Sequence, residues 1–367
     1  MWSFRRRRLC PFSSLIDMIY IHIPFCVRKC LYCDFYSVTD VSLKDAYTDA
    51  VIKEIVSLKG LKTDTVYIGG GTPTTLEDNL LKIAQAVKEN FILSDNCEFT
   101  VEANPGTVNK ALLKNLYSFG VNRISLGAQS FNDNELRALG RIHTAKEIFE
   151  SSDMVKEAGF KNFSLDLMLA VPEQTMESLS YTLGCIEKIN PPHVSAYSLI
   201  VEEGTAFYNM DLDLPDEETE REMYYYVTDT FKANGLKRYE ISNFAKKGFE
   251  SRHNTGYWTD CEYWGIGAGA HSYNNSVRYQ NASDIARYIK GEGRREDVIP
   301  ISEKERKLEL FMLGLRMTKG VLYNGEFPER VNPLIEKGLL EIMDDHLRLT
   351  MRGCDMANLV FMEFLND

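Results

Sequence analysis

Short apolar runs alternate with longer amphipathic stretches along most of the chain. Runs of apolar and β-branched residues predict strands, and stretches with apolar residues on one face predict helices. The predicted strands are residues 19–23, 65–68, 98–102, 123–126, 163–167 and 194–199. The predicted helices are residues 43–61, 76–91, 110–119, 145–158, 175–189 and 217–233. This alternation indicates an α/β fold with a parallel sheet, and six such strands fit a barrel or partial barrel.

The alternation stops after the last of these helices. Residues 239–242 and 265–273 predict irregular strands, and the charged stretch 291–297 predicts a linker. From Ser302 onwards the pattern predicts helices and a short sheet. We therefore expect a core barrel of residues 18–235, an extension of residues 236–297 and a small C-terminal domain of residues 298–367.

The charge balance argues against binding to nucleic acid. The chain has 53 acidic and 42 basic residues and a net charge of -11, whereas a nucleic-acid binder usually has an excess or a stripe of basic residues. The run Arg5–Arg8 stands in an N-terminal extension, residues 1–17, whose apolar stretch is too short and broken for a secretory signal. We expect Met18 to be the true first residue. The helical stretches carry charges, so we expect no membrane insertion and a cytoplasmic location.

Three of the eight cysteines lie close together, and without an export signal they favour metal binding over disulfides. Cys26, Cys30 and Cys33 have the spacing CxxxCxxC. Three thiolates on a short loop can each hold one iron of a [4Fe–4S] cluster. The fourth iron is then open to the amino and carboxylate groups of S-adenosylmethionine. An electron from the cluster splits the sulfonium to a 5′-deoxyadenosyl radical.

A structural zinc site is the alternative for this cluster of cysteines. Zinc usually takes four ligands on paired CxxC arms. His22 could complete such a set, but it lies within the first predicted strand. The five remaining cysteines are interpreted as small buried or surface residues: Cys10, Cys97, Cys185, Cys261 and Cys354.

The cysteines resemble those of the radical S-adenosylmethionine superfamily. CxxxCxYC follows the first predicted strand, and Gly-Gly-Gly-Thr-Pro at residues 69–73 follows the second. Glycines at a strand end alone would indicate only a turn, but in this order with the cysteines they carry the resemblance. It implies a partial (β/α)6 barrel in which the backbone of the glycine motif meets the methionine amino group. The implied contacts to S-adenosylmethionine include Tyr32, Gly70, Gly71 and Thr72.

Further motifs are similar to those of the oxygen-independent coproporphyrinogen oxidase group. They are residues 20–26, 102–105, 127–131, 140–141 and 166–168 with Pro172. In that group the matching residues line the S-adenosylmethionine site, which implies this role for Tyr20, Glu102, Gln129, Arg141 and Asp166. Glu102, Gln129 and Asp166 each lie in or at the end of a predicted strand, which is where the active sites of barrel proteins are usually found. The resemblance also implies a winged-helix-like C-terminal domain and an electron donor such as flavodoxin or ferredoxin.

Two departures argue against the decarboxylation of coproporphyrinogen. The true dehydrogenases of that group carry a further cysteine where this chain has Phe35, and they have a longer N-terminal segment that covers the substrate. Residues 253–258, with the pattern HNxxYW, resemble instead the signature of the heme chaperones. His253 could be an axial heme ligand, with Tyr257 and Trp258 against the porphyrin. The alternative is a packed aromatic loop with an internally bonded His253, and His271 is a second candidate ligand.

The resemblance thus implies one of two functions. The first is a heme chaperone that transfers heme to an acceptor protein, such as a membrane-bound respiratory cytochrome. The second is an oxygen-independent coproporphyrinogen III dehydrogenase, an enzyme that decarboxylates its porphyrinogen substrate by radical chemistry. The expected cofactors are a [4Fe–4S] cluster, S-adenosylmethionine and heme.

Overall fold

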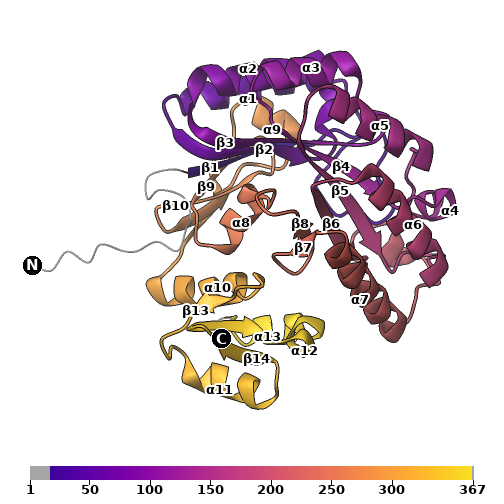
Figure 1. Cartoon of the computed structure of the whole chain (residues 1–367). Helices are drawn as coiled ribbons and strands as arrows, with labels where there is room; N and C mark the ends of the chain where they lie inside the picture. Colours follow the sequence, from indigo (N-terminus) through magenta and orange to yellow (C-terminus); the bar gives the residue numbers. More distant parts are fainter. Residues whose placement is uncertain (1–16, 366–367) are drawn as a thin grey trace, which may run out of the picture.

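Six parallel strands form the centre of a larger sheet in this computed structural model, which describes residues 17–365 (Figure 1). In order they are β1 (Asp17–Ile23), β2 (Lys62–Gly70), β3 (Ile92–Ala103), β4 (Arg123–Gln129), β5 (Asn162–Leu169) and β6 (His193–Ser198). Most of their apolar side chains are buried, as expected for parallel strands covered on both faces, whereas Ile92 at the start of β3 is exposed. Except for Asp17, the predicted N-terminal extension lies outside the described residues.

Helices cover the outer face of these strands (Figure 1). They are α1 (Lys44–Ser57), α2 (Asp78–Asn90), α3 (Lys110–Ser118), α4 (Asp133–Ala138), α5 (Ala145–Glu157), α6 (Met176–Ile189) and α7 (Glu217–Ala233), with the 3-10 turn η1 (Pro73–Leu76). Side-chain caps from Asn109, Thr144 and Thr175 begin α3, α5 and α6. Because β6 does not pair with β1, the sheet is a partial (β/α)6 barrel, as predicted.

The extension adds strands to both edges of this sheet. Its elements are β7 (Lys237–Arg238), β8 (Asn243–Ala245), α8 (Arg252–Trp258), β9 (Tyr263–Ile266), β10 (His271–Asn274), β11 (Val277–Gln280), α9 (Ile285–Ile289) and β12 (Glu296–Pro300). β9 pairs in parallel with β1, and β8 pairs antiparallel with β6. The sheet thus has twelve strands in the order β12-β11-β10-β9-β1-β2-β3-β4-β5-β6-β8-β7.

Three predictions for the extension were wrong in detail. Residues 239–242 form the turn between β7 and β8 instead of a strand, and residues 265–273 divide into two strands around a turn. The predicted linker, residues 291–297, already includes the start of β12, which pairs with β11. These strands are short, so their pairing partners decide their conformation and no period of two marks them in the sequence.

The small C-terminal domain has its own sheet and its own core. It contains α10 (Glu303–Gly314), β13 (Val321–Leu322), α11 (Pro328–Glu336), β14 (Leu340–Met343), β15 (His346–Leu349), α12 (Met351–Asp355) and α13 (Ala357–Met362). The strands pair in the order β13-β15-β14, and the buried core includes Leu308, Val331 and Leu347. Because β12 crosses the expected boundary at residue 298, we propose that this domain begins after Pro300.

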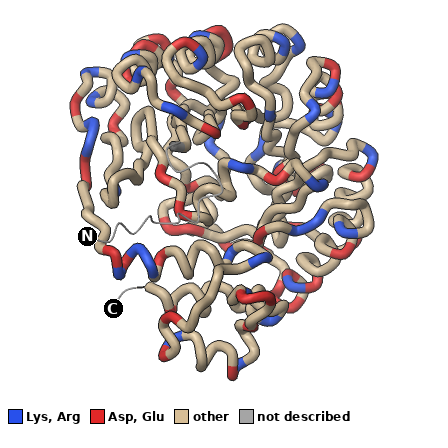
Figure 2. The backbone as a smooth tube through the Cα atoms, turned by 60° about the vertical axis from the view of Figure 1, so that its left-hand side comes forward, with Lys and Arg blue, Asp and Glu red and all other residues tan. Residues whose placement is uncertain are grey.

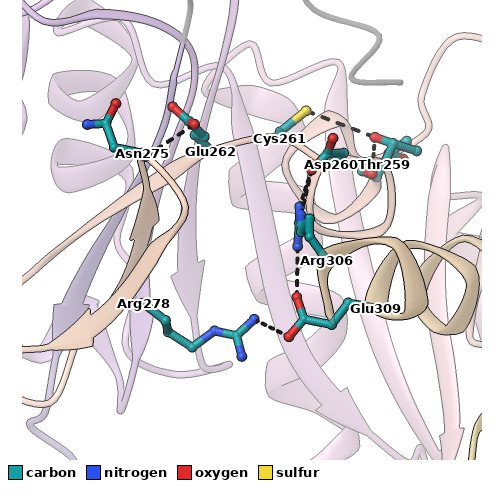
Figure 3. Close-up of polar contacts among 9 residues, drawn as sticks. Thr259, Asp260, Cys261, Glu262, Asn275, Arg278, Arg306 and Glu309 are labelled. Carbon is teal, nitrogen blue, oxygen red and sulfur yellow. Dashed lines mark hydrogen bonds and ion pairs between the residues drawn. The ribbon is translucent and has the colours of Figure 1, made fainter. Parts of the chain in front are cut away.

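Polar contacts join the small domain to the extension (Figure 3). Arg306 of α10 pairs with Asp260 and with Glu309, and Arg278 of β11 pairs with Glu309 at 3.1 Å. The Arg306 guanidinium also lies 4.2 Å from the ring centroid of Tyr273. Since these side chains are largely shielded from solvent, they hold α10 against β10 and β11.

Charged residues of both signs are interspersed along the backbone of the whole molecule (Figure 2). This distribution agrees with the mixed, net acidic composition of the chain. Within residues 17–365, none of the helices combines the length and the apolar character that crossing a membrane requires.

Candidate functional site

A cavity of about 310 Å³ lies at the carboxyl ends of the barrel strands. It is lined by the three clustered cysteines and by nearly all the residues predicted to contact S-adenosylmethionine: Cys26, Cys30, Cys33, Tyr32, Gly70, Gly71, Thr72, Glu102, Gln129, Arg141 and Asp166. The structure thus brings together residues that are far apart in the sequence. Tyr20 is the exception, because its side chain does not line the cavity.

The loop that carries the cysteines is held against the glycine motif by backbone hydrogen bonds. The Cys26 amide donates to the Val38 carbonyl at 2.9 Å, and the Thr72 amide donates to the Phe25 carbonyl at 2.7 Å. A Cβ atom on Gly71 would lie 2.7 Å from that carbonyl oxygen and 3.0 Å from the Cys26 sulfur. Glycine at position 71 therefore allows the end of β2 to pass directly beneath the cysteine loop.

The His22 ring explains why a glycine stands at position 70, and both of its ring nitrogens already have hydrogen-bond partners. Gly70 has a φ of +112°, and a Cβ there would lie 2.4 Å from the His22 ring. The two ring nitrogens of His22 are engaged with the Tyr20 hydroxyl at 2.9 Å and the Tyr36 carbonyl at 3.0 Å. Burial lowers the pKa of His22. Tyr20 thus contacts the glycine motif through His22.

The three cysteines suit a cluster better than a single ion. Their thiols are free, and burial raises the pKa of Cys26 and raises that of Cys33 to about 11. Within the described part of the chain, no three His, Cys, Asp or Glu side chains are arranged to hold one metal ion. A cluster in which each thiolate binds a separate iron does not need that convergence. The donor set and the adjoining cavity therefore fit a [4Fe–4S] cluster with an open iron.

Glu102 and Asp166 place two carboxyl groups on the cavity wall. Glu102 accepts hydrogen bonds from the Tyr67 hydroxyl at 2.6 Å and the Gly70 amide at 3.0 Å. Asp166 accepts one from the Ser125 hydroxyl at 3.2 Å. Burial raises the pKa of both groups, that of Glu102 to about 7. Each retains acceptor capacity for the hydroxyl or amino groups of a ligand.

Arg141 is a positive charge on the cavity wall beside the cysteines. Its guanidinium donates to the Asn104 side chain and to the Gly127 carbonyl, both at 2.6 Å, and lies 3.5 Å from the Cys30 sulfur. Its Nε atom is buried without a partner. Asn104 in turn donates to the Thr72 hydroxyl at 2.7 Å. A carboxylate ligand would find in Arg141 a donor that the protein holds in position.

Several cavity residues were missed by reasoning from the sequence: Tyr67, Asn104, Arg123, Ser125 and Tyr197. The position of Asn104 could have indicated its role, since it follows Glu102 by two residues, directly after the end of β3. Tyr197 donates to Gln129 at 3.2 Å, and Gln129 ends β4 with a φ of +65°. Such contacts depend on pairing between strands and leave no pattern in the sequence.

The HNxxYW segment forms the short helix α8 rather than a loop. His253 is 1% exposed, and its ring nitrogens are engaged with the Thr65 hydroxyl at 2.8 Å and the Tyr257 hydroxyl at 3.1 Å. Its ring stacks on Tyr67, and burial lowers its pKa to about 3. Among residues 253–258, Asn254 lines the cavity. The role of His253 in heme binding stays a prediction, and it requires a ring nitrogen to exchange its present partner for iron.

Two residues that the sequence analysis singled out lie on the surface. Phe35, which stands where the dehydrogenases have a further cysteine, is 64% exposed and borders the cavity. His271, the second candidate heme ligand, is exposed on β10. Both side chains are accessible to a binding partner.

Comparisons with known families match two parts of the chain. The radical SAM superfamily matches residues 20–186, and the HemN C-terminal domain matches residues 301–355. The solved structure of coproporphyrinogen III oxidase (HemN) from Escherichia coli superposes with a TM-score of 0.83. The superposition covers 97% of this chain and 91% of that chain at 22% sequence identity. The likeness confirms the predicted fold, including the small C-terminal domain.

Curated relatives are similar to the chain over nearly its whole length. The heme chaperone HemW of Lactococcus lactis is 39% identical over 368 residues, which cover 95% of this chain and 97% of the relative. The heme chaperone HemW of Bacillus subtilis is 40% identical over 378 residues, which cover 95% and 99%. The protein of the same name from Escherichia coli is 30% identical over 374 residues, which cover 95% and 97%.

Proposed function

Because the chain belongs to the HemW family of heme chaperones within the radical S-adenosylmethionine superfamily, we propose that it binds heme and delivers it to an acceptor protein. In this proposal it also holds a [4Fe–4S] cluster and S-adenosylmethionine. The cofactor part of this proposal rests on one observation. The three free cysteines, the glycine motif and several charged side chains line the same cavity.

Cys26, Cys30 and Cys33 are the proposed cluster ligands, and the cavity beside them is the proposed S-adenosylmethionine site. When bound, the cluster supplies a single electron for reductive cleavage of the sulfonium. Tyr32, Gly70, Gly71 and Thr72 form the wall next to the cysteines. Tyr20 is retained in this site as a positioning residue, because its hydroxyl fixes the His22 ring that packs on Gly70.

The charged residues of the cavity have complementary proposed roles. Arg141 pairs with the carboxylate of the methionine part, since its guanidinium already bridges two strand ends beside the cysteines. Glu102 and Asp166 accept hydrogen bonds from amino or ribose hydroxyl groups. Gln129, held by Tyr197, offers an amide to the adenosyl part. Together these side chains exclude water and orient the ligand.

For heme we propose His253 as the axial ligand and Tyr257 and Trp258 as part of the pocket wall. Support comes from the family of heme chaperones and from the aromatic packing around His253. The proposed acceptor is a membrane-bound respiratory cytochrome, and the proposed electron donor is a flavodoxin or ferredoxin. The proposed location is the cytoplasm.

A direct experiment separates heme delivery from the alternative activity. The reconstituted protein is incubated anaerobically with S-adenosylmethionine, a reductant and coproporphyrinogen III, and a second sample is titrated with heme. We expect saturable heme binding and no protoporphyrinogen, because Phe35 replaces the further cysteine of the dehydrogenases. Turnover to protoporphyrinogen would overturn the proposal in favour of oxygen-independent coproporphyrinogen III dehydrogenase activity.

A further inference from the structure

A second cavity, of about 230 Å³, lies where the extension meets the small C-terminal domain. We call it the arginine crevice, because its lining includes Arg238, Arg316 and Arg348. Glu341 is the carboxylate among the lining residues. Three guanidinium groups thus surround one hollow in a chain whose net charge is -11.

The carboxylates near the crevice leave much of this positive charge uncompensated. Glu341 is committed to Arg348, with which it pairs at 2.8 Å. Within residues 17–365, no carboxylate lies at ion-pair distance from Arg238 or Arg316. Glu240 is fully buried, and burial raises its pKa, although the nearby charges of Arg316 and Arg238 act in the opposite direction. A bound anion would supply the opposite charge that Arg238 and Arg316 lack at ion-pair distance among the described residues.

The two arginines without a carboxylate partner are held in place by uncharged groups. Arg238 donates to the Tyr224 hydroxyl at 2.7 Å and contacts the sulfur atoms of Met351 at 3.8 Å and Cys354 at 3.6 Å. The Nε atom of Arg316 is buried without a hydrogen-bond partner. These guanidinium groups are therefore oriented in advance and retain donors for a ligand.

Arg316 also connects the crevice to the HNxxYW helix. Its guanidinium lies 4.5 Å from the ring centroid of Trp258, the last residue of α8, and 5.7 Å from that of Phe361. An aromatic residue of the proposed heme motif thus packs on an arginine of the crevice. The crevice also contains Met351 and Cys354, and the sulfur atoms of methionine and cysteine are known ligands of heme iron.

Resting on the proposed heme-chaperone function, we propose that the arginine crevice binds the propionate carboxylates of heme through Arg238 and Arg316. Guanidinium groups match carboxylates in charge and geometry. A pocket that encloses a whole drug-sized ligand has roughly 300–1,000 Å³. The crevice is smaller, so it holds the charged edge of the porphyrin while the ring extends outside it.

The test compares heme with its dimethyl ester, in which the propionates carry no charge. Both are titrated by absorbance into the full-length reconstituted protein and into Arg238→Gln and Arg316→Gln. The wild-type protein should prefer heme, and each substitution should weaken heme affinity about tenfold to a hundredfold and reduce that preference. Arg287→Gln removes an exposed arginine that pairs with Glu296 outside the crevice, and it should behave as the wild type.

Thermal melts and cluster absorbance of the same samples show whether each variant is folded. If Arg238→Gln does not fold, Arg238→Lys, which keeps the positive charge, takes its place in the comparison. Wild-type binding of heme without any preference over the ester would overturn the crevice and leave the chaperone function standing. No binding of either compound would overturn both. Protection from melting by inorganic phosphate, with heme and ester bound equally, would identify a site for free anions and also overturn the proposal.

Discussion

Glu102 is a carboxyl group in surroundings that disfavour its charge. Burial raises its pKa to about 7 from a usual value of 4.5. The folded protein therefore keeps a proton on Glu102 at pH values where the unfolded chain has released it. The stability that this group contributes is complete below pH 4.5 and is lost as the pH rises through 7.

Glu102→Gln removes this titration and should change how stability depends on pH. The difference in unfolding free energy between variant and wild type should move in favour of the variant by about 1–3 kcal/mol between pH 5 and 8. Urea unfolding across that range measures it. Glu187→Gln, on the exposed face of α6, is the control and should show no such trend. A difference that stays constant with pH would contradict the raised pKa.

The cysteines give a second prediction for single residues. Alanine at Cys26, Cys30 or Cys33 should abolish the brown cluster absorbance, since each is one of three proposed protein ligands. Alanine at the buried Cys97 or Cys185 should leave it intact. Iron analysis after anaerobic reconstitution checks the result. Full four-iron content in any variant of the trio would refute the ligand assignment.

The residues of the candidate cavity could largely be predicted from the sequence, but their contacts could not. Spacing and motif order indicated the cysteines and the glycines, and the resemblance to the coproporphyrinogen oxidase group implied the charged residues at the strand ends. That Asn104 bridges Thr72 and Arg141 depends on three strand ends meeting in space. The missing side chain of Gly70 makes room for the His22 ring, a contact that no pattern in the sequence marks.

Among the elements, regular strands and helices were predictable, and short ones were not. Each barrel strand contains a short apolar segment that is buried in the sheet, and this segment marks the strand in the sequence. In contrast, α8 contains a glycine and β-branched and aromatic residues, which have low helix propensity. Its first turn is held by the Glu98 carboxylate, which accepts hydrogen bonds from the backbone amides of Arg252 and His253. Such elements form because of tertiary contacts.

The packing of the glycine motif under the cysteine loop predicts the effect of one added methyl group. Gly71→Ala should displace the Phe25 carbonyl and the Cys26 sulfur, lower the unfolding free energy by about 1–3 kcal/mol and reduce iron content. Gly184→Ala is a matched control, because that helical glycine has open space where the Cβ would lie. It should be neutral or stabilising. Equal iron content in the two variants would contradict the close packing.

The helix α8 supports two predictions about His253. His253→Ala should destabilise the heme-free protein, because it deletes two side-chain hydrogen bonds and a stacked ring. If the ring also binds iron, the Soret band of the heme-loaded variant should shift or weaken, while the cluster absorbance stays unchanged. Melts and heme titrations on one preparation check both. A lower melting temperature with an unchanged Soret band would mean that α8 is a packing element.

For the whole molecule, charged side chains contribute to the attachment of the small domain. Arg306→Met should lower the unfolding free energy by about 1–3 kcal/mol, since it leaves Asp260 and Glu309 without a shared partner. Lys307→Met, one position along the same helix, alters only an exposed ion pair and should have little effect. Thermal melts compare the two. Equal stability would mean that apolar packing alone holds the domain.

The place of β1 in the sheet has a consequence for how the chain folds during synthesis. β1 is the first strand described in the sequence, yet one of its two neighbours is β9, which the ribosome adds only after the entire barrel. Until residue 266 has emerged, one edge of the strand that leads into the cysteines has no partner. Unpaired strand edges promote association between chains. A nascent chain that stalls before β9 should therefore aggregate more readily than one that includes β9.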